Sequence, residues 1–272
     1  MELFAVLSGF VWRRHRISHA LAARGLQWQE LSMHHLSFDP GLTGRLTFRH
    51  HVPTKPPLVH GRHDLGLFDT RDAVLIVPEG IDPAQPMPLM VLFHGGGGSA
   101  EKILPVMQRH AETHKFLLLV PQSIMPTWDI VIAGNGPDRE RLDHALHEVA
   151  SRFTLATERF CFAGHSDGGS YALSNGLCNG DIVTHILAFS AGFMTVLHQE
   201  GTPHIFIAHG IKDEQTPVET AGRAHATRLH AAGYDVTYIE YDGPHQSQPH
   251  IVETGVGYFL RYPASDRTMT SG

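Results

Sequence analysis

The chain has 272 residues, of which 42% are hydrophobic and 18% are charged, and its formal net charge is −6. This composition is typical of a globular protein with a sizeable core and excludes disordered and collagen-like chains. The 21 basic residues form no stripe that could contact phosphates, so we expect no nucleic-acid partner. Two cysteines are too few for a disulfide framework, and their spacing fits no zinc pattern.

The first residues resemble the hydrophobic region of a secretory signal, but their charges are in the wrong place. Arg13, Arg14 and Arg16 follow the apolar run 1–12 instead of preceding it. We therefore expect residues 1–40 to be an amphipathic, helical extension of a cytoplasmic protein. No apolar run approaches the roughly 18 to 20 residues that span a bilayer, so we expect no membrane span.

From Arg45 onward, short apolar runs alternate with helical patterns, which predicts a mostly parallel sheet with helices on both faces. Residues 45–52 and 73–77 predict the first two strands, and the Pro- and Gly-bearing stretch 53–70 predicts a loop between them. Breakers bound six further apolar runs, which we expect to be the central strands: 89–93, 116–120, 160–163, 186–189, 205–208 and 236–241. Residues 41–265 are expected to form one domain, followed by a tail at 266–272.

Three helices are predicted around these strands. The stretch 138–153 places its apolar residues at i, i+3, i+4, i+7 and i+8, so they share one helix face. A second helix is expected to begin at Thr216, with Glu219 closing a capping box. A last helix from Ser247 is expected to pack on the sheet.

Residues 164–168 read Gly-His-Ser-Asp-Gly, a G-x-S-x-G string. The string follows a predicted strand and precedes a stretch that can be helical, which is the strand-turn-helix context of a nucleophile elbow. Glycines on either side of the turn remove the Cβ atoms that would clash while the serine is lifted into solvent. Ser166 is the expected nucleophile, although a Gly-rich connection with a helix-capping serine remains the alternative.

An activated serine needs a histidine base and an acid that orients it, and in this arrangement they follow the serine in the order acid, then histidine. Asp213 follows the predicted strand 205–208 and is the expected acid, with Glu214, Glu219 and Asp242 as rivals.

His245 follows the last predicted strand and is the expected base; His209 and His250 are weaker candidates. Helical His pairs raise a metal hypothesis, but none has an obvious third ligand, so we expect solvated faces and no metal. These pairs are His15/His19, His110/His114 and His144/His147.

The predicted strand 89–93 continues into His94 and four glycines, which allow backbone N–H groups to approach a substrate oxygen. The expected oxyanion donors are the N–H groups of Gly96 and Asp167. The spacing fits neither a P-loop nor a dinucleotide-binding loop, so we expect no nucleotide cofactor. Trp128 lies in a loop at the same predicted edge and either lines a substrate pocket or is simply packed.

Together, these residues and the stretches TWDIVIAGNGPD, FAGHSDGGSYALSNGL and HGIKDEQTP resemble the α/β-hydrolase superfamily, in particular serine esterases of the phospholipase/carboxylesterase and dienelactone-hydrolase-like type. The resemblance covers roughly residues 45–262 and implies the roles given above for Ser166, Asp213 and His245. Two features depart from it, namely the first 40 residues and the histidine loop GPHQSQPH. Residues 190–203 leave no room for a large cap domain, so the site should be open.

The expected function is hydrolysis of short-chain or exposed carboxylic esters through an acyl-enzyme, without a cofactor. Two alternatives use the same fold: a peptidase or acyltransferase with the same triad, and a receptor that binds ligands without catalysis. The natural substrate, the acyl preference and the oligomeric state do not follow from the sequence.

Overall fold

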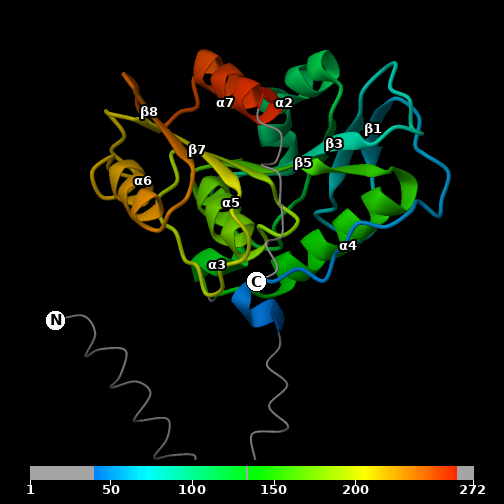
Figure 1. Ribbon diagram of the computed structural model, residues 1–272, viewed down its shortest axis with the longest axis horizontal. Helices are drawn as coiled ribbons and strands as arrows, with labels where there is room; N and C mark the ends of the chain where they lie inside the picture. Colours follow the sequence, from blue (N-terminus) through cyan, green and yellow to red (C-terminus); the bar gives the residue numbers. More distant parts are fainter. Residues whose placement is uncertain (1–39, 133, 262–272) are drawn as a thin grey trace, which may run out of the picture. The chain divides into compact units, whose positions relative to one another are not determined.

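The computed structural model describes residues 40–132 and 134–261, which contain one eight-stranded sheet (Figure 1). The strand order is β1-β2-β4-β3-β5-β6-β7-β8. β1 and β2 run antiparallel to their neighbours, and the other pairs are parallel. The strands are β1 (Gly61–Asp64), β2 (Val74–Val77), β3 (Met87–Phe93), β4 (Leu117–Val120), β5 (Leu155–His165), β6 (His185–Phe189), β7 (His204–Gly210) and β8 (Val236–Tyr241).

Helices cover both faces of the sheet (Figure 1). Alternate residues of a strand point to opposite faces: in β3, Leu89 and Val91 belong to the apolar core that contains residues of α4 (Pro137–Arg152), α5 (Asp167–Cys178) and α6 (Gly222–Ala231), whereas Met90 belongs to the core that contains residues of α2 (Ala100–His114) and α7 (Pro249–Arg261). The strands are therefore buried on both sides, which explains their continuous apolar runs. The helices are the short 3-10 helix η2 (Pro40–Thr43), α2 (Ala100–His114), α3 (Asp129–Ile132), α4 (Pro137–Arg152), α5 (Asp167–Cys178), α6 (Gly222–Ala231) and α7 (Pro249–Arg261).

The prediction of a strand at 45–52 is wrong. The N–H groups of Thr47 and Phe48 donate to the Asp143 carboxylate, at 2.9 and 2.7 Å, instead of to a neighbouring strand. A side chain of α4 therefore satisfies this backbone, and no ladder forms. The edge strand β1 lies instead within the stretch 53–70, which was predicted to be a loop.

The capping box predicted at Thr216 is also not formed. Residues 216–221 form a bend and a turn, and α6 begins only at Gly222. The Thr216 hydroxyl donates to Asp213 Oδ2, while Glu219 pairs with Arg223. The predicted strand at 73–77, the six central strands and the helices at 138–153 and from Ser247 are confirmed to within a few residues. The predicted extension 1–40, apart from Pro40, and the tail 266–272 lie outside the described residues.

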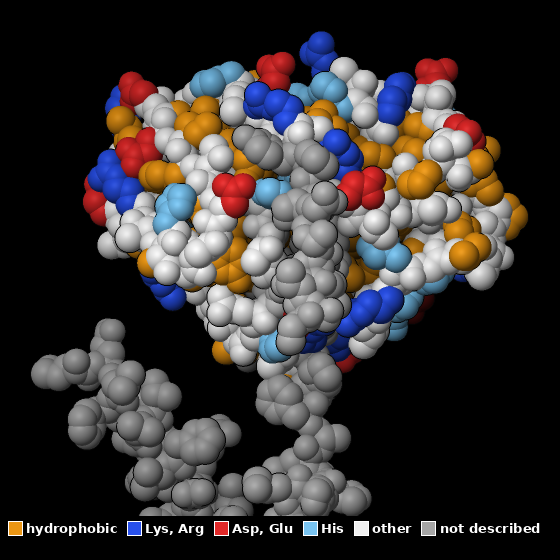
Figure 2. All heavy atoms as spheres, viewed as in Figure 1, with side chains coloured by type: hydrophobic (Ala, Val, Ile, Leu, Met, Phe, Trp, Pro, Cys, Tyr) orange, Lys and Arg blue, Asp and Glu red, His pale blue; other side chains and the backbone are white. Residues whose placement is uncertain are grey.

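The parallel strands bring the ends of β3, β5, β7 and β8 to one edge of the sheet. Each of these strands is followed there by a loop or helix start that carries a candidate site residue. Within the described part of the chain, no helix or strand lies between β6 and β7, so the fold has no cap domain there. On the face drawn in Figure 2, basic and acidic side chains are interspersed and not separated by sign.

Candidate active site

Ser166 lies on a sharp turn between β5 and α5. Its backbone has φ 57° and ψ −123°, a strained conformation for a residue other than glycine. The turn is possible because its neighbours are small: a Cβ on Gly168 would lie 2.2 Å from the Phe93 carbonyl oxygen, and one on Gly164 would lie 2.3 Å from Gly168. The Ser166 N–H donates to Phe189 O on β6 at 2.9 Å, which anchors the turn to the sheet.

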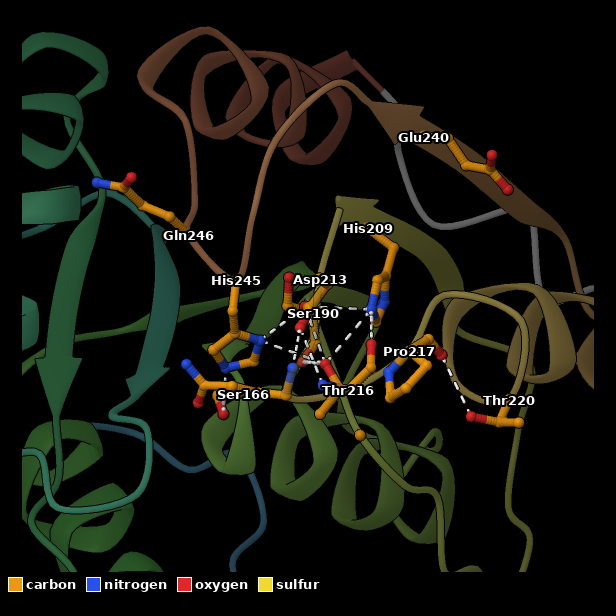
Figure 3. Close-up of polar contacts among 12 residues, drawn as sticks. Ser166, Ser190, His209, Asp213, Thr216, Pro217, Thr220, Glu240, His245 and Gln246 are labelled. Atoms are coloured by element: carbon orange, nitrogen blue, oxygen red, sulfur yellow. Dashed lines mark hydrogen bonds and ion pairs between the residues drawn. The ribbon is translucent and has the colours of Figure 1, made fainter. Parts of the chain in front are cut away.

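The side chains of Ser166, His245 and Asp213 meet in a chain of hydrogen bonds (Figure 3). Ser166 Oγ lies 2.8 Å from His245 Nε2, and His245 Nδ1 lies 2.7 Å from Asp213 Oδ2. The Asp213 side chain is fully buried and that of His245 is 9% exposed. Since a carboxylate only accepts, Nδ1 carries the imidazole proton and Nε2 is free to accept the serine proton. This is the arrangement of a nucleophile, a base and an orienting acid.

The Asp213 carboxylate is held by its own loop. Oδ1 accepts the N–H groups of Gln215 at 3.0 Å and Thr216 at 2.9 Å, and Oδ2 accepts the Thr216 hydroxyl at 2.9 Å. Burial alone would raise the pKa of Asp213, but the bonds from Thr216 and His245 outweigh it and lower the pKa to about 2. The acid is therefore ionised at neutral pH. Within the described ranges, the rivals Glu214, Glu219 and Asp242 form no hydrogen bond or ion pair with His245, whose Nδ1 lies against Asp213.

His209 lies beside the acid and does not contact Ser166. It is fully buried, with its Nε2 2.7 Å from the Thr216 carbonyl oxygen and 3.3 Å from Asp213 Oδ2. Because both of these oxygens only accept, Nε2 is the protonated nitrogen. His209 therefore secures the acid loop, a role that its position in the sequence did not indicate. His250 is exposed on α7, away from these contacts.

His165, the residue before the nucleophile, packs against the base. Its ring lies 4.8 Å from that of His245. Burial, and then the nearby His245, lower the pKa of His165 to about 4. His165 is therefore neutral near pH 7 and places no second positive charge beside the imidazolium that His245 would form.

The Gly-rich loop after β3 lies against the nucleophile. A Cβ on Gly95 would lie 3.3 Å from Ser166 Cβ, and one on Gly96 would lie 2.6 Å from Asp167 Oδ2. The N–H of Gly97 is taken by Pro126 O at 2.8 Å, whereas that of Gly96 makes no hydrogen bond within the described residues. The Asp167 N–H is in the first turn of α5, where donors have no intrahelical partner. Two N–H groups without a hydrogen-bond partner among the described residues thus lie next to Ser166.

Trp128 is packed against this loop. It is 1% exposed, and its ring lies 4.6 Å from that of Tyr171. Its indole N–H donates to the His94 carbonyl oxygen at 2.8 Å, since a buried indole N–H needs an acceptor. Trp128 is thus buried next to the Gly-rich loop and hydrogen-bonded to it.

Among residues 40–132 and 134–261, no three His, Cys, Asp or Glu side chains are grouped so that they could hold a metal ion. In the same ranges, no helix has the length and apolar character needed to cross a bilayer.

No protein-family model matches the chain, and no curated protein matches it. Solved structures do. Esterase PE8 is 18% identical with a TM-score of 0.56, over 68% of this chain and 96% of that chain. Fluorophosphonate-binding serine hydrolase F of Staphylococcus aureus is 16% identical with a TM-score of 0.59, over 71% and 93%. Esterase 2 of Thermogutta terrifontis is 16% identical with a TM-score of 0.58, over 73% and 90%. The chain has the α/β-hydrolase fold.

Proposed function

We propose that the protein is a serine hydrolase that cleaves carboxylic esters through a triad of Ser166, Asp213 and His245. The observation that carries this proposal is the continuous hydrogen-bonded chain, with 2.8 Å from serine to histidine and 2.7 Å from histidine to aspartate. It starts at a serine on a strained turn, next to two N–H groups without a hydrogen-bond partner among the described residues. A packing role explains neither the strain nor the ionised, buried acid.

In the first step, His245 Nε2 takes the proton of Ser166 as Oγ attacks the ester carbonyl carbon. The carbonyl oxygen becomes an oxyanion, which the N–H groups of Gly96 and Asp167 stabilise. The Asp213 carboxylate stabilises the imidazolium and keeps its ring oriented. His245 then gives the proton to the leaving alkoxide, and an acyl-Ser166 remains.

In the second step, His245 takes a proton from water, which attacks the acyl carbon. The oxyanion forms in the same place, and it collapses to release the carboxylic acid as Ser166 regains its proton. These residues complete both steps by moving one proton at a time between His245 and the reacting oxygen atoms.

Labelling with a fluorophosphonate probe tests the activated serine directly. We expect one adduct per chain, located by mass spectrometry on the peptide that contains Ser166, and none in Ser166→Ala or in heat-denatured protein. A folded wild-type protein that stays unlabelled would instead support a receptor that binds ligands without catalysis. Comparison of turnover with ester, amide and added alcohol acceptors then separates an esterase from a peptidase or acyltransferase.

Turnover of an activated ester tests the base. We expect His245→Ala, like Ser166→Ala, to lower kcat about a thousandfold or more, because triad members act as a unit. His250→Ala is the matched control, since this exposed histidine lies only five residues further along the chain. Equal losses in the two histidine variants would remove His245 from the mechanism.

A further inference from the structure

The side chain of Asp167 is a carboxylate at the candidate oxyanion site, although only the N–H of this residue is needed there. Thr127 Oγ1 donates to Asp167 Oδ2 at 2.6 Å. The same oxygen lies 2.6 Å from the place where a Cβ on Gly96 would be. The second carboxylate oxygen, Oδ1, accepts no hydrogen bond within the described residues and is not among their buried polar atoms, so it faces solvent. Thus Thr127 holds Oδ2 of the carboxylate, whereas Oδ1 is exposed to solvent.

The cations of the neighbouring loops do not pair with this carboxylate. Lys102 Nζ donates to the Gly97 carbonyl oxygen at 3.2 Å, and Arg71 donates to the carbonyl oxygens of Ser123 and Met125. Burial lowers the pKa of the nearby His94, and it outweighs the charge of Asp167, which acts to raise that pKa. In the part of the chain that the structure describes, no Lys, Arg or His nitrogen forms an ion pair with the Asp167 carboxylate within 4.0 Å. Its negative charge is therefore left without a local ion pair beside the position where a second negative charge would develop.

The Asp167 carboxylate and the developing oxyanion are both negative and repel each other, so a neutral ester gains nothing from Asp167 in the transition state. A positively charged group on the substrate would reverse that balance. The leaving group must lie over His245 Nε2 to receive its proton, which leaves the acyl chain to extend elsewhere. The Asp167 carboxylate accepts from Thr127 and lies beside Gly96, on the side of Ser166 that carries the candidate oxyanion N–H groups. An acyl chain that extends away from His245, on the side of Ser166 where Gly96 lies, would pass this carboxylate.

We propose that the Asp167 side chain is a specificity determinant that selects esters with a positively charged acyl group. This inference rests on the proposed function, because it needs an ester bound at Ser166. The competing explanation is structural: a carboxylate in the first turn of α5 interacts favourably with the helix dipole. That explanation predicts a change in stability when the charge is removed, with no change in substrate preference.

The test compares two 4-nitrophenyl esters of the same shape. One carries a 4-(trimethylammonio)butanoyl group, and the other carries a 5,5-dimethylhexanoyl group, in which carbon replaces the charged nitrogen. At low ionic strength, we expect the wild-type kcat/KM to be about five to ten times higher for the cationic ester, which is the size of one screened charge pair. In Asp167→Asn the ratio should fall to about one, because the charge is lost. Asparagine keeps the backbone N–H, and its side-chain oxygen can still accept from Thr127.

Asp64→Asn is the matched control, because it removes the same charge from the exposed end of β1 and should leave the ratio unchanged. Lys102→Gln should widen the ratio, since it removes a cation from the first turn of α2, where Lys102 contacts Gly97 of the Gly-rich loop. Salt at about 0.5 M should shrink the wild-type ratio towards one.

An Asp167→Asn ratio equal to that of the wild type would overturn the subsite while leaving the esterase proposal intact. Folded wild-type protein that hydrolyses neither ester would overturn both. If Asp167→Asn unfolds early in thermal scans, Asp167→Ser supplies the same comparison.

Discussion

Thr216 ties the acid of the candidate triad to the following loop from two directions. Its N–H and its hydroxyl donate to different oxygens of Asp213, and its carbonyl oxygen accepts from His209 (Figure 3). The hydroxyl also lies 3.3 Å from His245 Nδ1. Thr216 therefore holds both oxygens of the carboxylate, and its hydroxyl contributes to the orientation of Asp213 towards the histidine.

Replacing Thr216 with valine keeps the shape of the side chain and removes this hydroxyl. We expect Thr216→Val to lower kcat/KM for an activated ester about tenfold, because a hydrogen bond to a charged group contributes about 1.5 to 3 kcal/mol and part of the orientation survives through the N–H. Thr220→Val is the control, since the Thr220 hydroxyl bonds only to Pro217 O. A loss of similar size in both variants, or no loss in Thr216→Val, would contradict the orienting role.

At the scale of single elements, two glycines of α7 have opposite environments. A Cβ on Gly255 would lie 3.0 Å from the ring of Phe189, where the helix packs on the sheet. A Cβ on Gly257 would meet only the end of the Arg261 side chain, at 3.7 Å. The first glycine allows close packing, whereas the second only adds conformational entropy to the unfolded chain.

Alanine at these two positions should therefore act in opposite directions. We expect Gly257→Ala to raise the free energy of unfolding by about 0.5 to 1 kcal/mol, which is the difference in helix propensity. Gly255→Ala should lower it, because the helix or Phe189 must move. Urea unfolding of both variants measures the two changes. A stabilising Gly255→Ala would show that Phe189 or the helix moves aside at little cost in free energy.

His225 gives helix α6 a pH-dependent stability. It is 4% exposed, and burial followed by the nearby charges of Arg228 and His209 lowers its pKa to about 4. The unfolded chain, with an ordinary histidine pKa of about 6.5, therefore takes up a proton at a higher pH than the folded protein does. The stabilisation is complete above about pH 6.5 and is lost as the pH falls towards 4.

His225→Leu removes this titration. Relative to wild type, we expect the variant to gain about 2 kcal/mol of unfolding free energy between pH 8 and pH 5, from the difference between the two pKa values. Urea unfolding at both pH values measures the gain. The matched control is His230→Leu on the exposed side of the same helix. Parallel stability curves for the wild type and His225→Leu would show that His225 is not the group responsible.

At the scale of the whole molecule, one sheet separates two apolar cores. The core on the α4, α5 and α6 side and the core on the α2 and α7 side share every central strand. Loss of either core would expose one apolar face of the strands that also form the remaining core. Neither core is therefore stable by itself. For this reason, we propose that residues 41–265 fold as one catalytic domain.

This arrangement predicts a single unfolding transition. We expect urea curves from far-ultraviolet and near-ultraviolet circular dichroism to coincide, because secondary structure and side-chain packing are lost together. A chain that begins at Pro40 serves as the comparison, since any signal from the first 39 residues is absent from it. Two separated transitions in that shorter chain would show that the two cores unfold independently.

Local patterns were enough to predict most of the sheet and the expected positions of the triad. The strands and α4 were predictable because apolar periodicity reports burial directly, and the elbow was predictable because glycines two residues on either side of Ser166 suit one tight turn. Two of the failed predictions, the strand at 45–52 and the capping box at Thr216, have the same cause. Thr47 and Phe48 bond to Asp143, 96 and 95 residues away, and Thr216 bonds to an acid that itself faces a distant histidine.

The sequence by itself determined the order of the elements and the residue types available at one edge of the sheet, because both depend on neighbours along the chain. Only the tertiary structure decided which of these residues meet. Ser166 and His245 are 79 residues apart, and their 2.8 Å contact depends on the pairing of β5, β6, β7 and β8. The same holds for the buried position of Trp128 and for the open carboxylate of Asp167. Contacts of this kind are set by packing in three dimensions, which local propensity does not encode.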